Sequence, residues 1–498
     1  MIDLAASSTE PTDIDADLLV LAVAEPDLER GDWLASVDAR VGSVLRRAGA
    51  EERFRAKLGQ TLMVHVRDVR AQRIALVGLG AAPDPSGQAL RLAAGAAARL
   101  ATGVGAARVA FAWSAAGAAL ADARACEIAA EGALLGGYRF DKYLTDERSR
   151  RPATAAFILR PPTAVAAQDV APAFARAQTT ARAVARARDL VNEPAGALTP
   201  TVLAETAGAW ARDAHATVEV FDRARCAALG MGLFLAVAQG STQEPRFIHL
   251  VWTPAGARRR VVVVGKGITF DSGGLSLKTN EGMLDMKTDM AGAAAVLAAA
   301  TAAAEEQLPV EVHALAACTE NMPSGNAYKL GDVIRSLDGK TVEINNTDAE
   351  GRLTLADALS FGLRFRPDAL LDFATLTGAC MVALGPHTAG VMSNDDGLAG
   401  ELLAAAQRAG EDMWRLPLPP RLSEQLKSEI ADFKNTGERW GGALTAGLFL
   451  KEFVGAVPWV HVDIAGPSSA SKEYGHVSKG GTGFAAAAIL EFLRRAAA

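Results

Sequence analysis

Cysteine is scarce in this chain, which has four among its 498 residues and no C-x-x-C pair. The four are Cys126, Cys226, Cys318 and Cys380. This spacing excludes a disulfide framework and a cysteine-based metal site, and it predicts buried thiols in a reducing compartment. The first twenty residues contain five acidic side chains and no basic segment followed by an apolar one, so they predict no signal peptide. We therefore expect a cytoplasmic protein.

The chain also lacks a long apolar segment. Its longest run of small apolar residues, Met290–Ala304, is dominated by alanine and is shorter than the roughly 20 residues that span a bilayer. It predicts a buried helix and no membrane partner. The chain has no excess of basic residues either, and its formal net charge is -6. This balance argues against nucleic acid as a partner, and the run Arg258-Arg259-Arg260 is typical of a solvated strand edge.

Three familiar catalytic signatures are absent. Without H-E-x-x-H, the sequence does not predict a histidine-held zinc site. Without G-x-S-x-G, and with none of the seven histidines an evident base, Ser272 does not predict a serine hydrolase. Gly78-Leu79-Gly80 lacks the third glycine of a dinucleotide-binding loop, so it predicts a plain turn between a strand and a helix.

Short apolar runs alternate with helical patterns along the whole chain, which predicts an α/β protein. We expect two domains, each a mostly parallel or mixed sheet flanked by helices, with the functional site in the larger C-terminal one. The boundaries predicted from Arg160-Pro161-Pro162 and from the arginine-rich helical pattern after it are 1–170, a linker helix at 171–191, and 192–498. The first domain is expected to be variable, with an oligomerisation or regulatory role.

A polar stretch from Asn346 to Leu353 stands out in the second half. Asp348 and Glu350 are two residues apart, so both carboxylates point to one side of an extended backbone. Arg352 follows on the same side, and a helical pattern begins at Leu353 and runs to Arg364. This arrangement can hold cations on one side and an anion at the helix start. An isolated stretch of this kind is also typical of a turn that caps a surface helix.

A second polar stretch, Lys266 to Asp289, follows the run Val261–Val264, which predicts a strand buried on both faces. Ligands of open α/β sheets bind beyond the carboxyl ends of the strands. The stretch contains Asp271, and also Asp285 and Asp289, which are four residues apart and share one face if this segment is helical.

Carboxylates from both stretches would repel one another if they met. Two like charges about 4 Å apart cost roughly 4 kcal/mol at an effective dielectric near 20, and several such pairs exceed the stability of a typical fold. Either the groups stay apart or divalent cations hold them together. An oxygen-rich site with one nitrogen ligand suits Mn²⁺ or Mg²⁺ as well as Zn²⁺. Lys266 by itself is more typical of a surface or phosphate-contacting lysine, because a lysine ligand must first lose a proton.

Three motifs closely resemble the leucyl (cytosol) aminopeptidases, which are two-metal exopeptidases. They are the segments Val264–Lys278, Met286–Ala293 and Asn346–Leu353. The resemblance continues through Thr375–Gly378, Ser393–Asp395, Asp432–Asn435 and His461–Ala465, and so covers the chain from Asn192 onward. The first domain matches in general layout only. One departure is Gly196, where relatives usually carry asparagine.

The resemblance implies a site for two divalent metal ions, Zn²⁺ or Mn²⁺, with Mg²⁺ and Co²⁺ as alternatives. The implied ligands are Lys266, Asp271, Asp289, Asp348 and Glu350. Asp271 and Glu350 would bridge both ions, Lys266 and Asp289 would serve the tighter ion, and Asp348 the more exchangeable one. Asp285 would then be a bystander.

The resemblance also implies how residues act on a peptide with a free N-terminus. Lys278 would stabilise the oxyanion that forms when a metal-activated water attacks the scissile carbonyl. Arg352 would hold a bicarbonate ion that shuttles the proton. Leucine-like side chains would be favoured in a pocket formed by Met286, Thr375, Gly378 and Ala465. The family also forms homohexamers.

Two other functions compete with this prediction. One is a regulatory or binding protein whose first domain contacts nucleic acid or nucleotide and whose metals only stabilise the fold. The presence of Lys278 and Arg352 argues against it, because a structural metal site needs neither. The other keeps the chemistry but narrows the substrate to Cys-Gly-type dipeptides.

Overall fold

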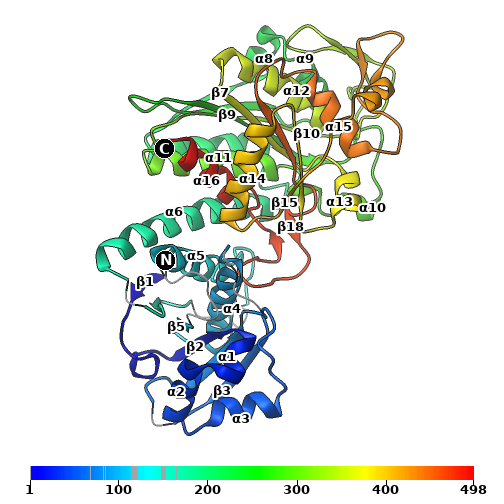
Figure 1. The fold of residues 1–498 in the computed structure, drawn as a ribbon. Coiled ribbons are helices and arrows are strands. Elements are labelled where there is room, and N and C mark those ends of the chain that lie inside the picture. The colour runs from blue at the N-terminus through cyan, green and yellow to red at the C-terminus, as the bar shows by residue number, and fades with distance from the viewer. Residues whose placement is uncertain are drawn as a thin grey trace. The chain divides into compact units, whose positions relative to one another are not determined.

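The computed structural model describes residues 2–67, 69–81, 84, 86–114, 122–146, 153–163 and 165–497. The chain forms two compact units. The first comprises Met1–Ala181 and Ser471–Lys479, and the second comprises Arg182–Ala470 and Gly480–Ala498. Each unit is built around its own large sheet (Figure 1).

The first unit contains a six-stranded sheet in the order β1-β6-β5-β2-β4-β3. All neighbours are parallel except β3 and β4, which pair antiparallel. The strands are β1 (Asp3–Ala6), β2 (Leu18–Val23), β3 (Thr61–His65), β4 (Arg73–Gly78), β5 (Arg108–Trp113) and β6 (Ala156–Arg160).

Helices cover both faces of this sheet. Alternate residues of β2 point to opposite sides, so Leu18 and Val20 pack with α4 (Gln88–Val104) and α5 (Ala123–Gly136), and Leu19 and Leu21 pack under α2 (Asp32–Arg40) and α3 (Val44–Glu51). The short helix α1 (Glu25–Arg30) follows β2 directly. The returning segment Ser471–Lys479 belongs to this unit, where the carbonyl of Gly475 accepts a hydrogen bond from Arg99 at 2.8 Å.

The second unit contains an eight-stranded mixed sheet in the order β15-β14-β17-β13-β9-β10-β8-β7. The strands are β7 (Thr217–Phe221), β8 (Arg246–Trp252), β9 (Arg260–Asp271), β10 (Glu311–Asn321), β13 (Ala369–Ala374), β14 (Ala389–Ser393), β15 (Met413–Arg415) and β17 (Trp459–Asp463). The central strands β10, β9, β13 and β17 are parallel, so their carboxyl ends lie at one edge.

Two groups of helices pack on the two faces of the second sheet (Figure 1). One face carries α11 (Ala291–Glu305), α14 (Asp396–Ala409) and α16 (Ala486–Ala496), and the other carries α9 (Gly232–Val237), α12 (Gly351–Gly362) and α15 (Gly442–Lys451). A long helix, α6 (Ala167–Asn192), precedes α7 (Pro200–Asp213). The predicted α/β fold class, with helices flanking two sheets, is confirmed.

Two local predictions are confirmed and one is corrected. The alanine-rich run forms the buried helix α11, and all four cysteines are buried and free. The strand predicted at Val261–Val264 does not end there, because β10 continues to pair with it through Gly267 and on to Asp271. Lys266 is therefore held inside a strand and does not lie in a loop beyond it.

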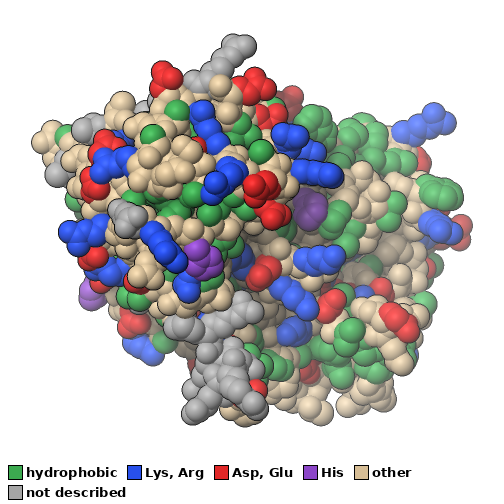
Figure 2. All heavy atoms as spheres, turned by 90° about the horizontal axis from the view of Figure 1, so that it is seen from below, with side chains coloured by type: hydrophobic (Ala, Val, Ile, Leu, Met, Phe, Trp, Pro, Cys, Tyr) green, Lys and Arg blue, Asp and Glu red, His purple; other side chains and the backbone are tan. Residues whose placement is uncertain are grey.

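The face of the molecule drawn in Figure 2 carries charges of both signs. On the face drawn in Figure 2, basic and acidic side chains are interspersed with apolar ones, and its described residues form no extended area of one sign. None of the described helices is both long enough and apolar enough to cross a membrane.

Two buried histidines occupy neighbouring strands of the second sheet. His249 of β8 and His313 of β10 stack, and the nitrogens Nε2 and Nδ1 that face each other are 2.9 Å apart. His313 Nε2 lies 2.9 Å from the carboxylate of Glu311. A carboxylate only accepts, so His313 donates from Nε2 and accepts from His249 at Nδ1. Burial lowers the pKa of His249 to about 4, with His313 adding to the effect.

The low pKa of His249 predicts a loss of stability in mild acid. The unfolded chain takes up this proton near pH 6.5 and the folded chain only near pH 4, so the free energy of unfolding falls as pH drops through this window. Between pH 7 and 5 the loss is about 2 kcal/mol. The variant His249→Gln keeps an N–H donor for His313 but does not titrate. Urea unfolding at both pH values is expected to show a smaller loss in the variant, and an equal loss would contradict this role.

Candidate metal centre

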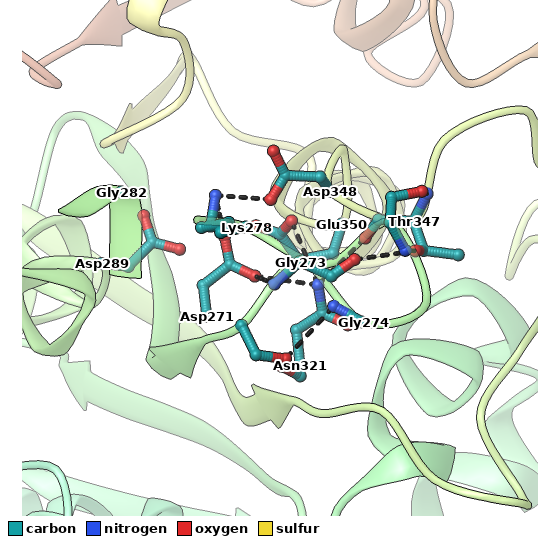
Figure 3. Close-up of polar contacts among 12 residues, drawn as sticks. Asp271, Gly273, Gly274, Lys278, Gly282, Asp289, Asn321, Thr347, Asp348 and Glu350 are labelled. Atoms are coloured by element: carbon teal, nitrogen blue, oxygen red, sulfur yellow. Dashed lines mark hydrogen bonds and ion pairs between the residues drawn. The ribbon is translucent and has the colours of Figure 1, made fainter. Parts of the chain in front are cut away.

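The carboxyl edge of the second sheet gathers polar side chains from three strands. Asp271 of β9 and Asn321 of β10 are two of them and are drawn in Figure 3. Lys266 lies within β9, and Asp271 is its last residue. Asn321 is the last residue of β10 and pairs with Asp271 in the ladder, and Thr375 follows β13 directly. Because these strands are parallel, their functional side chains converge on one place.

Two helices begin at the same edge. Asp289 lies two residues before α11, and Glu350 directly precedes α12. A β-carbon at Gly351 would lie 2.5 Å from Cε of Lys266, so a larger residue there would displace the lysine side chain from its present position. The two polar stretches of the sequence therefore meet, as the metal hypothesis requires.

Lys266 organises one half of the site. Its ammonium lies 2.8 Å from the carboxylate of Asp289 and 2.9 Å from that of Glu350, and it donates to the carbonyl of Thr375 at 3.0 Å. Burial disfavours the charged form, but the carboxylates of Asp289 and Glu350 outweigh it, so the pKa of Lys266 is raised. In this arrangement the ammonium supplies positive charge between two buried carboxylates.

Lys278 organises the other half. Its ammonium lies 2.8 Å from Asp271 and also pairs with Asp348. Asp271 is buried, while the Asp348 side chain is 34% exposed, so this half faces the opening of the site. The pKa of Lys278 is raised, because the attraction of Asp271 and Asp348 outweighs burial.

The donor set fits divalent cations. Asp271, Asp348 and Glu350 each offer a carboxylate oxygen, and these oxygens all lie within 4.8 Å of one another. With Asp289 there are four carboxylates against two ammonium groups, which leaves two formal negative charges in a mostly buried cluster. Burial and the charge of Glu350 raise the pKa of Asp271, which marks a site short of positive charge.

Asp285 lies apart from this cluster. The helical face that would have joined Asp285 to Asp289 does not form, because α10 (Asn280–Met283) ends and a separate 3-10 turn, η4 (Met286–Thr288), follows. Asp285 is exposed, whereas Asp289 is buried.

Asn321 is a residue of the site that the sequence analysis did not identify. Its amide donates to Asp271 at 2.8 Å and to the carbonyl of Thr347 at 2.9 Å, so it ties the first polar stretch to the second. Tyr328 donates to the same carbonyl at 2.7 Å. Asn321 stands alone at the end of a strand, and only its register with Asp271 reveals its position.

Arg352 lies in the first turn of α12 and is buried. It donates to the carbonyl of Asn435 at 2.9 Å, and its Nε has no hydrogen-bond partner among the described residues. Burial lowers the pKa of Arg352 to about 10, which still leaves the guanidinium charged at neutral pH. A buried cation with a free donor at a helix start is suited to bind an anion.

The four predicted pocket residues lie on segments next to this cluster. Thr375 donates to Asp289 at 2.7 Å. Gly378 begins α13 (Gly378–Leu384) and has open space on its side-chain side. Ala465 follows β17, and its N–H donates to Asp463, which also accepts from Thr377. Met286 begins η4 and is half-buried.

Ser272 has a structural role here. Its hydroxyl donates to the carbonyl of Asn321 at 2.7 Å and accepts from the N–H of Gly274 at 3.2 Å, which stabilises the turn after β9. These contacts agree with the sequence-based prediction against a serine hydrolase.

Comparison with known proteins places this geometry in a family. Residues 185–490 match the catalytic domain of the cytosol aminopeptidase family, and residues 20–147 match its N-terminal domain. A probable cytosol aminopeptidase of Cyanothece sp. is 42% identical over 498 residues, covering 99% of both chains. Another, of Geobacter sp., is 43% identical over 492 residues, covering 98% of this chain and 99% of the relative.

Solved structures of similar proteins also support membership of this family. A tomato leucine aminopeptidase mutant superposes with a TM-score of 0.91 at 35% identity, covering 99% of this chain and 97% of that one. The bottromycin maturation enzyme BotP in complex with Mn superposes with a TM-score of 0.84 at 38% identity, covering 97% of this chain and 100% of that one. The regulatory and nucleic-acid-binding alternatives find no support in these matches. The chain belongs to the cytosol aminopeptidase family and is a metal-dependent aminopeptidase.

Proposed function

We propose that the protein releases leucine-like residues from the N-termini of peptides, using two divalent metal ions per chain. The observation that carries this proposal is the convergence of four carboxylates and two lysines beside a buried arginine with a free donor. A purely structural metal site needs neither Lys278 nor Arg352.

The proposed metal ligands are Lys266, Asp271, Asp289, Asp348 and Glu350. These five side chains would together hold both ions, which would supply an activated water and polarise the scissile carbonyl. Lys266 must lose its proton to act as a ligand, so metal uptake is expected to release protons. Mn²⁺ and Zn²⁺ are the proposed native ions, Mg²⁺ and Co²⁺ the alternatives. BotP, as an Mn complex, supports Mn²⁺.

Lys278 and Arg352 are the proposed catalytic residues. The side chain of Lys278 is 17% exposed at the opening of the site, where its ammonium can donate to the oxyanion that develops on the scissile carbonyl. Its raised pKa keeps it charged at neutral pH. Arg352 would hold a bicarbonate ion at the start of α12. This ion would transfer the proton during hydrolysis.

Substrate choice is proposed to depend on Met286, Thr375, Gly378 and Ala465. The open space beside Gly378 and the small side chain of Ala465 leave room for a branched aliphatic group. Thr375 also hydrogen-bonds Asp289, so the pocket and the metal centre share a wall.

We also propose that the protein forms a homohexamer and that it is located in the cytoplasm. We further propose three functional segments, namely an N-terminal domain at residues 1–170, a linker helix at 171–191 and a catalytic domain at 192–498. The N-terminal domain would have an oligomerisation or regulatory role. Four buried, free cysteines support a reducing compartment.

Substrate profiling with metal analysis of the same sample tests this proposal. Leucyl amide, a leucyl dipeptide and Cys-Gly are compared with Mn²⁺ or Zn²⁺ supplied. We expect the leucyl substrates to react at least about tenfold faster than Cys-Gly, since one to two extra methylenes in an apolar pocket are worth that much. Faster hydrolysis of Cys-Gly would favour the narrower dipeptidase. A shift of DNA at physiological salt, with no hydrolysis, would reverse the assignment.

A further inference from the structure

A cavity of about 490 Å³ lies in the first unit, between α1 and α3. It opens at the carboxyl ends of β2 and β4, since Glu25 follows β2 by two residues and Leu76 lies near the end of β4. The segments that follow these two strands pack on opposite faces of the sheet, which is the arrangement that opens ligand crevices in α/β folds. The volume lies in the range of about 300–1,000 Å³ that small-molecule sites occupy.

The floor of this cavity is apolar. It is formed by Leu28, Leu34, Leu45, Phe54 and Leu76. All but Leu28 are buried members of the core on this face of the sheet. An aliphatic or aromatic group seated there would be removed from water at its inner side.

The two walls of the cavity carry opposite charges. Glu25 and Glu29 come from α1, one helical turn apart, and the other wall carries Arg46 of α3 and Arg55 and Lys57 of the following loop. None of these five side chains forms an ion pair with another residue that the structure describes, and Arg46 donates to the carbonyl of Gly31, directly after α1, at 3.4 Å. Arg55 and Lys57 are thus the basic groups of the cavity that lie apart from the acidic helix α1.

The loop that forms the basic wall is fixed in place. The side-chain oxygen of Gln60 accepts from the N–H of Arg55 at 2.8 Å, and the carbonyl of Ala56 accepts from Gly80 at 2.9 Å. Arg53 and Ala56 are held at φ 56° and 54°, in the left-handed region that non-glycine residues seldom adopt. Such strain persists only where its surroundings over-determine it, so the backbone that carries Arg55 and Lys57 is preformed.

We infer that this cavity binds a zwitterion with an apolar side chain, namely a free amino acid such as leucine or a short apolar peptide. Its ammonium group would face Glu25 and Glu29, its carboxylate would face Arg55 and Lys57, and its side chain would lie on the apolar floor. An anion or a cation alone would leave one wall without a partner. The ligand is of the class that the established activity consumes and releases, so this site would sense peptide turnover.

A cavity-filling variant tests the inference in the full-length, metal-loaded protein. Gly49 lines the cavity, and a β-carbon there would meet only Cβ of Phe54, at 4.0 Å. The β-carbon of a leucine at position 49 is therefore accommodated without a clash, its side chain is expected to fill part of the cavity, and leucine favours helix α3. Gly103 of α4 has open space on its side-chain side and lies outside the cavity, so Gly103→Leu is the matched control.

Equilibrium dialysis with labelled leucine measures the moles bound per chain. Leucine bound at the metal centre is common to all three proteins, so wild type and Gly103→Leu are expected to bind one mole more than Gly49→Leu. The double variant Glu29→Gln/Arg55→Gln is expected to bind this extra leucine at least about tenfold more weakly. Hydrolysis of leucyl amide without added leucine should be unchanged in Gly49→Leu, and this readout separates the inference from the proposed function.

Equal leucine binding by wild type and Gly49→Leu would overturn the inference. So would N-acetylleucine competing for the extra site as well as leucine does, because it lacks the ammonium group. A leucyl-leucine analogue with a reduced peptide bond, which the enzyme cannot hydrolyse, would support the inference and identify the peptide as the ligand if it competes more strongly than leucine.

Discussion

Replacement of Glu350 by alanine is expected to remove bound metal and to slow hydrolysis of leucyl amide by roughly 10³-fold or more. Glu350 is buried, it lies beside Lys266, and its oxygen belongs to the cluster with Asp271 and Asp348. Losing it removes a proposed metal ligand and with it the several kcal/mol that Lewis-acid activation contributes. Atomic emission analysis and leucyl amide turnover, measured on one preparation, give the two readouts.

Loss of folding has to be separated from loss of metal in this experiment. Glu350→Ala leaves the buried Lys266 with one carboxylate fewer, which destabilises the native state. Glu350→Gln keeps the size of the side chain and removes only its charge, so it is the second variant. Asp285→Ala removes an exposed carboxylate from the same polar region and serves as the control, with metal content and turnover unchanged. A folded Glu350→Gln protein with two metals and full activity would refute the ligand assignment.

Replacement of Arg352 by alanine is expected to slow turnover by about 10²–10⁴-fold while metal content stays near two per chain, because proton shuttling typically contributes that much. Arg352 lies two residues from Glu350 but contacts Asn435, and its free Nε faces no described partner. The rates of the wild type and the variant are compared in carbonate-free buffer with and without added bicarbonate. The wild type should respond to bicarbonate and the variant should not.

Arg364→Ala is the matched control, since this exposed arginine follows the same helix and stacks on Phe361 away from the cluster. It should keep both turnover and the bicarbonate response. Loss of metal in Arg352→Ala would show that the arginine supports the metal cluster, and a bicarbonate response equal to that of wild type would show that the ion binds elsewhere.

The ligand types, and the need for a cation, could be deduced from the residues alone. Asp348 and Glu350 are two residues apart and Asp271 follows a buried run, so the sequence already predicts carboxylates beyond a strand end. The extended backbone expected at Asp348 and Glu350 does not form, because Asp348 lies in a turn and Glu350 caps α12. Repulsion among them excludes a close cluster without positive charge. The structure supplies part of that charge through Lys266 and Lys278, whose side chains pair with the same carboxylates.

The end of the predicted strand at Val264 was wrong for a physical reason. Gly265 and Gly267 interrupt the apolar run, and glycine is depleted in strands, but β10 pairs with β9 beyond both glycines. Ladder pairing with a neighbouring strand overrides the weak local preference of glycine for turns. Lys266 consequently extends from a rigid strand, which fixes its ammonium near Asp289.

The chain by itself determined the α/β class, the kind of side chains at the centre and the chemistry that they can perform, because these follow from residue type and from spacings of a few positions. Only the tertiary structure brought Asn321 to Asp271 across 50 residues and Arg352 to Asn435 across 83. Only the packed fold also formed the charged cavity of the first unit. Contacts over such separations depend on strand register and on how the helices pack. Both are fixed only in the complete fold, because no short segment of the sequence determines them.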